Sequence, residues 1–236
     1  MDDRQTATIV TSPRDGEAAH VRVEELSAER YVDDPPEIPW HITPVAGDIA
    51  VQLRTTVRRV AVGAGLARNT ELMERVRQVE GVPAVVTSPA GGTFIVGGDA
   101  WLGLCAIGVP LPGQPLPLDW MVRSLHHWFD AALAPLGVNT EVGRVEGAWC
   151  PGFSDIATHG RKLAGLGFRV TRDWVVMRGV MAVQPMTDAD HDLLVQCHRL
   201  INVEVRGDTA ISLSEASGLP GLDVQAAIDA MRDVEI

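Results

Sequence analysis

The sequence predicts one α+β domain, in which short strands and amphipathic helices follow one another irregularly. Apolar runs rich in β-branched and aromatic residues come in succession, as expected for strands that pair within mixed sheets. Helical periodicity occurs between these runs without alternating with them one for one, which disfavours a doubly wound parallel sheet. The chain has 236 residues, enough for a sizeable core in a single domain.

Strands are expected where an apolar run is bounded by turn residues. The first such run, "RRVAVG", ends at Gly63. Two long runs further along the chain flank a tight turn at Thr171 and Arg172. The predicted strands are 58–63, 82–88, 92–98, 100–110, 160–170 and 173–183.

Helices are expected where apolar residues recur every three to four positions. In the first of them Asn69 can cap the N-terminus, and Gly81 lies past the C-terminal end. The strongest pattern, "PLDWMVRSLHHWFDAALAPLG", has Asp119 in its first turn, where the helix dipole favours an anion. The predicted helices are 69–81, 117–137, 188–202 and 223–233.

Composition excludes several classes of protein. A net charge of −11 argues against non-specific nucleic-acid binding, which depends on a basic face. No apolar run approaches the roughly 18 residues of a membrane span. The first residues have neither a basic start nor an apolar stretch, so we expect no secretory signal. Three widely spaced cysteines, at positions 105, 150 and 197, suggest no disulfide framework and predict a cytoplasmic protein.

The N-terminal part differs in character from the rest. Residues 1–35 are polar and acidic, and we expect them to form an extension that is in part disordered or drapes over the domain. The proline-rich stretch 33–44 is typical of a linker, because each proline removes a backbone donor. Residues 36–236 are then expected to form the single functional domain.

The stretch "AWCPGFSDIATHGRKLAG" combines a cysteine with the only lysine of the chain. Pro151 and Gly152 exclude a regular helix, so Cys150 is expected in a loop, where reactive residues concentrate. A thiolate is a nucleophile that a nearby cation favours. A buried structural thiol is the alternative, because free cysteine is among the most buried residue types.

A hairpin would bring that lysine close to the cysteine. Gly160 provides a turn after His159, and folding back at this turn places Lys162 against the segment that follows Cys150. His159 itself is either a general base or a solvated turn residue. We expect no metal site at four further histidines, His126, His127, His191 and His198, since their adjacent or seven-residue spacings leave too few ligands together.

The paired glycines Gly91 and Gly92 lie between two strand-like runs. They allow the backbone to approach a ligand closely, or they simply form a turn. They match neither a G-x-G-x-x-G motif that opens a helix nor a P-loop, so a nucleotide phosphate site is not supported.

The segment "WCPGFSDIATHGRKLAGLGFRV" resembles the signature of the lipoate–protein ligase and lipoyl/octanoyltransferase family, of the biotin/lipoate ligase fold. Members carry a hairpin of the form D-x-G-(R/K)-K, whose lysine contacts the acyl carbonyl, and Lys162 falls on that lysine. The prefix C-P-G-x-x-D is similar to the octanoyl/lipoyl amidotransferase branch, in which the cysteine matched by Cys150 carries the acyl group as a thioester. The resemblance covers roughly residues 40 to 235.

The resemblance implies a site and a set of partners. Cys150 and Lys162 would be catalytic; the residues that would bind the acyl substrate are Gly91, Gly92, Thr93, Asp155 and Gly165. Acyl-carrier and lipoyl-domain proteins would be the partners, namely glycine cleavage H-type proteins and the E2 domains of 2-oxoacid dehydrogenases. No metal or bound cofactor is required, and neither nucleic acid nor membrane is expected to take part.

The chain also departs from the family pattern. The arginines that contact the acyl-adenylate phosphate in the ligases are replaced by Thr87 and Ser88, which favours transferase over ligase. The asparagine and serine of a following family strand are Gly103 and Cys105 here. An ATP-dependent lipoate–protein ligase with a separate accessory subunit, or a non-catalytic acyl- or cofactor-binding homologue, remain alternatives.

Overall fold

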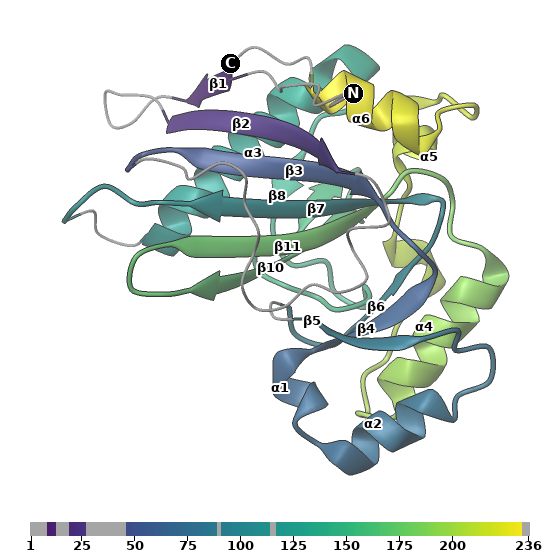
Figure 1. The fold of residues 1–236 in the computed structure, drawn as a ribbon. Helices are drawn as coiled ribbons and strands as arrows, with labels where there is room; N and C mark the ends of the chain where they lie inside the picture. The colour runs from purple at the N-terminus through teal and green to yellow at the C-terminus, as the bar shows by residue number, and fades with distance from the viewer. Residues whose placement is uncertain (1–8, 13–18, 27–45, 89–90, 114–116, 233–236) are drawn as a thin grey trace, which may run out of the picture.

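An eight-stranded, mostly antiparallel sheet forms the larger part of the fold. The structure is a computed structural model that describes residues 9–12, 19–26, 46–88, 91–113 and 117–232. The strand order is β1-β2-β3-β7-β11-β10-β9-β8, and only β2 and β3 run parallel (Figure 1). The strands are β1 (Ile9–Ser12), β2 (Ala19–Leu26), β3 (Ile49–Thr55), β7 (Trp101–Gly108), β8 (Glu141–Val142), β9 (Ile156–Thr158), β10 (Arg161–Val170) and β11 (Val175–Ala182).

Helices α3 (Pro117–Leu133) and α6 (Val224–Arg232) cover one face of this sheet (Figure 1). Their apolar residues recur at helical spacing, and the sheet meets them with every second residue of its strands, because side chains alternate between the two faces. On β3, Ile49, Val51 and Leu53 are fully buried in this core. A short 3-10 turn (Ala134–Leu136) ends the α3 segment, and α5 (Leu213–Ser217) precedes α6.

A second, smaller sheet forms a separate layer below the large one. Its order is β5-β4-β6, with β4 (Arg59–Gly63), β5 (Val85–Ser88) and β6 (Phe94–Gly97). Helices α1 (Ala64–Ala67), α2 (Thr70–Arg77) and α4 (Asp188–Arg199) lie beside it (Figure 1). A second apolar core joins this sheet and α4 to one end of the large sheet, through Trp101, Trp149 and Val180.

The predicted α+β class is confirmed, and each predicted strand and helix is present with shifted ends. Asn69 caps α2 by accepting a hydrogen bond from the amide of Leu72 at 3.0 Å, as expected. Strand β3 was not predicted from its sequence, "IAVQLRT". Gln52 and Arg54 interrupt its apolar run, yet both are buried in the fold.

Two strands come from the stretch that we expected to be an extension. β1 and β2 pair with each other, and β2 pairs with β3, so these parts of residues 1–35 belong to the large sheet. The rest of that stretch and the whole of the proposed linker 33–44 lie outside the described residues. Among the helices that the structure describes, none has the length and apolar character needed to cross a bilayer.

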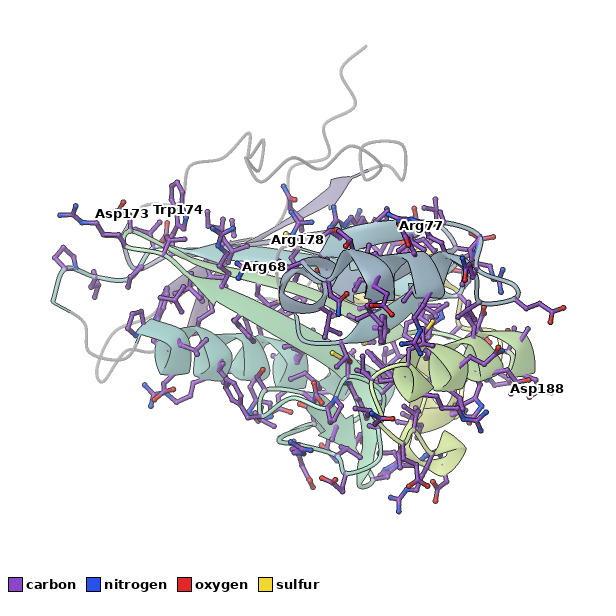
Figure 2. The ribbon with its side chains drawn as sticks, turned by 90° about the horizontal axis from the view of Figure 1, so that it is seen from below. Arg68, Arg77, Asp173, Trp174, Arg178 and Asp188 are labelled. Atoms are coloured by element: carbon purple, nitrogen blue, oxygen red, sulfur yellow. The ribbon has the colours of Figure 1, made fainter. Side chains whose placement is uncertain are left out.

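The two ends of the large sheet differ in their surroundings. Asp173 and Trp174 lie at the tip of the β10–β11 hairpin, and Asp188 at the start of α4 is at the opposite end of the molecule (Figure 2). Trp174 is about half exposed there. The other end of the hairpin strands meets the small sheet and α4, and this is where Cys150 and Lys162 lie.

Candidate functional site

Cys150 occupies a turn with an unusual backbone conformation. Its φ is +42°, in the left-handed region, where a side chain raises the energy by about 1 kcal/mol or more. Trp149 before it is buried, and Pro151 after it prevents a helix or strand. A residue in this region persists only where its neighbours hold it, so the contacts around the turn decide its geometry.

The hairpin predicted after Cys150 is present. Thr158 at the end of β9 pairs with Arg161 at the start of β10, which leaves a two-residue loop. His159 and Gly160 in this loop have φ values of +51° and +69°, as a type I′ turn requires at both central positions. The turn returns the chain beside its own path, and Lys162 therefore lies against the Cys150 turn.

The ammonium group of Lys162 is surrounded by oxygen atoms of that turn. It donates to the carbonyl oxygens of Trp149 at 2.8 Å and Cys150 at 2.9 Å, and its nitrogen lies 2.9 Å from Oδ2 of Asp155. The same nitrogen is 4.0 Å from the centroid of the Trp149 ring, close enough for a cation–π contact. An ammonium has three hydrogens, and three oxygens take them. With all three hydrogens directed at these oxygens, Lys162 holds the backbone of the turn.

Lys162 and Asp155 form a buried ion pair. Their side chains are 0% and 1% exposed. Burial lowers the pKa of Lys162, whereas the charge of Asp155 opposes that change. Burial likewise raises the pKa of Asp155, opposed by Lys162 and by the amide of Gly152, which donates to Oδ2 at 2.8 Å. Each charge therefore depends on the other to remain ionised inside the protein.

A glycine segment lies beside the sulfur of Cys150. The amide N–H of Thr93 donates to Sγ at 3.2 Å, where it is positioned to stabilise negative charge that develops on the sulfur. A Cβ placed on Gly92 would lie 3.8 Å from the same sulfur. On the other side of the segment, a Cβ placed on Gly63 would lie only 2.6 Å from the carbonyl oxygen of Gly91. The close approach of β4 to the glycine segment thus requires a residue without a side chain at Gly63, whereas a Cβ on Gly92 would make an ordinary van der Waals contact with the sulfur.

His198 of α4 completes the surroundings of the turn. Its ring is fully buried, with Nε2 at 3.0 Å from Oγ1 of Thr93 and 3.3 Å from the amide nitrogen of Cys150. The ring of Phe94 meets it edge-on at 5.4 Å. Burial lowers the pKa of His198; a bond to the Leu194 carbonyl opposes this, and the charge of Lys162 adds to it.

The structure brings together the residues singled out in the sequence. Lys162 contacts both Cys150 and Asp155, and Thr93 contacts Cys150, with Gly92 beside the sulfur. Asp155 is too deeply buried to present its carboxylate at the surface, and its contacts are with Lys162 and Gly152.

Gly165 has a packing role in this structure. A Cβ added to it would lie 2.7 Å from the ring of Trp149 and 3.0 Å from Cε of Lys162. Gly103, at the position where the family pattern has an asparagine, is restricted by packing in a similar way. A Cβ there would lie 3.0 Å from Cγ of Arg54. The space that a side chain would need at Gly103 is therefore occupied by the Arg54 stem.

The other cysteines are buried, as expected of core residues. Cys105 lies in β7, and Cys197 lies in α4, where burial raises its pKa to about 11. Among the described residues, no three histidine, cysteine, aspartate or glutamate side chains gather as a metal site would need.

From the sequence, His198 is considered only as a metal ligand, a role that is not expected, and it is not placed in this site. Its position four residues after Leu194 places it on the buried side of α4, and this spacing is the only signal in the sequence. A buried histidine of this kind is compatible with an ordinary core position. Its contacts come from Thr93 and Cys150, which lie far away along the chain.

Comparisons with known proteins identify a family and several similar proteins. Residues 45–234 match the family model of the lipoyl protein ligase A/B catalytic domain. Two curated relatives are named octanoyl-GcvH:protein N-octanoyltransferase. The one from Kyrpidia tusciae is 28% identical over 164 residues, covering 64% of this chain and 56% of the relative. The one from Geobacillus kaustophilus is 27% identical, covering 66% and 56%. The matched region thus spans little more than half the length of these relatives.

Solved structures share the fold. Protein Ta0514 of T. acidophilum, solved with bound lipoic acid, gives a TM-score of 0.58 at 13% identity, covering 78% of this chain and 69% of that one. A lipoate-protein ligase A bound with ATP gives 0.56 at 14% identity, covering 78% and 70%. At such identities the likeness concerns the fold, and the predicted ligase-like catalytic domain is confirmed at that level.

Proposed function

This chain belongs to the lipoyl protein ligase A/B catalytic domain family, and from that membership and its site we propose that it transfers octanoyl or lipoyl groups between proteins through a thioester on Cys150. The observation that carries the proposal is the held turn: Cys150 is kept in a left-handed conformation, with its sulfur against a backbone amide and its carbonyl on a buried ammonium. The names of the curated relatives support the octanoyl group and a GcvH-type carrier as substrates.

The proposed reaction has two acyl-transfer steps. In the first, the Cys150 thiolate attacks the acyl carbonyl on a lysine amide of the donor carrier, the carbon–sulfur bond forms, and the carbon–nitrogen bond breaks. The released lysine amine of the donor takes up a proton. In the second, a lysine amine of an acceptor lipoyl domain attacks the thioester, a new amide forms, and the sulfur leaves as thiolate. The amide broken on the donor and the amide formed on the acceptor are the same kind of bond, so no ATP, metal or bound cofactor enters the overall balance.

Two groups would stabilise charge on the reacting atoms. The amide of Thr93 faces the sulfur and supports the thiolate before attack and after it leaves. Lys162 is the proposed partner of the acyl oxygen. Because its three hydrogens are taken up by Trp149, Cys150 and Asp155, the acyl oxygen would replace one of the two carbonyls when substrate binds. Asp155 keeps the ammonium charged throughout.

The proposal also specifies the acyl-binding wall. Gly92 leaves the space beside the sulfur free of a side chain, and the backbone of Gly91 and Gly92 would contact the first carbons of the acyl chain. Asp155 and Gly165 act on binding through Lys162 and Trp149, which they hold in place.

Intact-mass analysis tests the function. The purified protein is incubated with an octanoylated GcvH-type carrier without ATP, and then an unmodified lipoyl domain is added. We expect an acyl adduct on the protein that is lost when the lipoyl domain becomes acylated. Cys150→Ala should form no adduct, whereas Cys105→Ala, which removes a buried cysteine elsewhere, should behave as the unchanged protein.

Three outcomes would overturn the proposal. An adduct that persists in Cys150→Ala would show that the thioester is not on this residue. Acylation of the lipoyl domain by free lipoate and ATP, with no transfer from the carrier, would identify a ligase instead. Binding of an acyl ligand without turnover in either assay would point to a non-catalytic homologue.

A further inference from the structure

The neighbours of the His198 ring determine which of its two nitrogens carries the hydrogen. Nδ1 lies 2.8 Å from the carbonyl oxygen of Leu194, one turn earlier in α4. A carbonyl oxygen can only accept, so Nδ1 carries the hydrogen. In the neutral ring Nε2 then has a free electron pair and acts as an acceptor.

Two donors from other parts of the chain face that acceptor. The amide N–H of Cys150 approaches Nε2 at 3.3 Å, and the Thr93 hydroxyl lies 3.0 Å from it. Thr93 is also the residue whose amide contacts the sulfur of Cys150. One ring therefore contacts the nucleophile's backbone and the residue that touches its sulfur.

The turn is thereby held at both backbone groups of Cys150, its amide and its carbonyl. Lys162 of β10 binds the carbonyl oxygen of Cys150, and His198 of α4 accepts from its amide. Fixing both groups of the Cys150 residue defines its left-handed φ and with it the direction of the side chain.

We propose that His198 is a positioning residue for acyl transfer, whose neutral ring, as acceptor at Nε2, holds Cys150 and Thr93 in the arrangement that presents the sulfur. This inference rests on the proposed function and adds to it a condition: the ring must be uncharged for transfer to occur. A proton on Nε2 would turn the acceptor into a donor facing the Cys150 N–H, which is itself a donor, and the contact would be lost.

The surroundings keep the ring neutral. Lys162 is the charged group that acts on it, and Asp155 pairs with that lysine on the side of the hairpin. The thiol of Cys150 is the titratable group on the turn, and Phe94 presents an uncharged ring from β6. Burial lowers the pKa of His198, so the neutral ring persists below the ordinary histidine value of 6.5.

Two substitutions of His198 separate the role of Nε2 as a hydrogen-bond acceptor from the effect of protonating the ring. His198→Gln places an amide oxygen near the position of Nε2, accepts from the same N–H, and cannot be protonated in this range. His198→Leu has similar bulk and no acceptor. His191→Gln, on the same helix and half-buried, is the matched control.

The kinetic readout is the rate of octanoyl transfer as a function of pH. We expect kcat to fall about tenfold in His198→Leu with KM nearly unchanged, as for a buried N–H left without an acceptor. His198→Gln should recover most of that loss. Because the pKa of His198 is lowered, the unchanged protein and the His191→Gln control should lose activity only on acidification well below pH 6.5, and His198→Gln should retain it.

A spectroscopic readout keeps the inference separate from the function. The chain has three cysteines, so selective ¹⁵N-cysteine labelling gives few amide signals, assigned with Cys150→Ala and Cys105→Ala. The Cys150 amide signal should shift as His198 is protonated and should stay in place in His198→Gln, with Cys105 as internal reference.

The outcomes are distinguishable. If octanoyl transfer through Cys150 is found but His198→Leu and His198→Gln match the unchanged protein at every pH, the positioning role is refuted and the function stands. If the Cys150 amide does not respond to acid, the positioning role is refuted as well. If no acyl adduct forms, yet the amide titrates only when His198 is present, the contact is supported and the proposed function fails.

Discussion

Separating Lys162 from Asp155 should destabilise the protein far more than breaking a surface ion pair. Both side chains are buried, and the two atoms lie 2.9 Å apart. Removing one partner of such a pair leaves an uncompensated charge, which lowers the free energy of unfolding by about 3–5 kcal/mol. Lys162→Met also removes the donor to two carbonyl oxygens, at about 1 kcal/mol each. Asp155→Asn keeps the size of the side chain and removes only the charge.

The measurement is a double-mutant cycle in urea, followed by tryptophan fluorescence. Lys162→Met, Asp155→Asn and the double variant give the coupling energy of the pair, which we expect to be about 2–3 kcal/mol. Each single variant should also lower Tm by roughly 6–20 °C, since 1 kcal/mol corresponds to about 2–4 °C for a chain of this size.

The chain offers a matched control in Arg144 and Glu146. Their atoms are 3.0 Å apart, but the side chains are 59% and 81% exposed. The same cycle on this pair, with Arg144→Met and Glu146→Gln, should give less than about 1 kcal/mol. A coupling energy for Lys162 and Asp155 as small as that of the control would refute the argument that burial makes their pairing essential.

Two further predictions concern the backbone around the sulfur. Gly63→Ala should lower stability by about 1–3 kcal/mol and slow thioester formation, because the new Cβ would lie within 2.7 Å of the carbonyl oxygens of Gly91 and Gly92. Gly65→Ala, where a Cβ meets nothing within 4 Å, is the control, and equal effects at both positions in urea unfolding would contradict the reasoning. Cys150→Gly should be more stable than Cys150→Ala by about 1 kcal/mol, because glycine adopts a φ of +42° without strain; calorimetry showing the reverse order would argue against a strained turn.

Much of the fold could be predicted because its elements carry local signals. The type I′ loop at His159 and Gly160 needs residues that accept positive φ, and Asn69 is a typical cap, so both could be identified in the sequence. Strand β3 was missed although Ile49, Val51 and Leu53 stand at every second position, which is typical of a strand with one buried face. Only the tertiary structure decided that Gln52 and Arg54, on its second face, are buried as well.

The candidate site likewise has one part that the sequence predicted and one part that it did not. The neighbourhood of Cys150 and Lys162 follows from a short hairpin, and the resemblance of its motif identified the family. That Lys162 would direct its three hydrogens at protein oxygens was not predictable, because this depends on the left-handed turn that points the carbonyls of Trp149 and Cys150 toward it.

By itself, the sequence determined the α+β class, most of the elements, and the hairpin that joins the cysteine to the only lysine, since each depends on residues close together in the chain. The tertiary structure alone decided that Thr93 and His198 meet Cys150. These three residues come from the approach to β6, from helix α4 and from a turn between them, and they are held together by the core that packs α4 and the small sheet against the large one. Contacts of this kind depend on how elements pack, and no local pattern of residues specifies them.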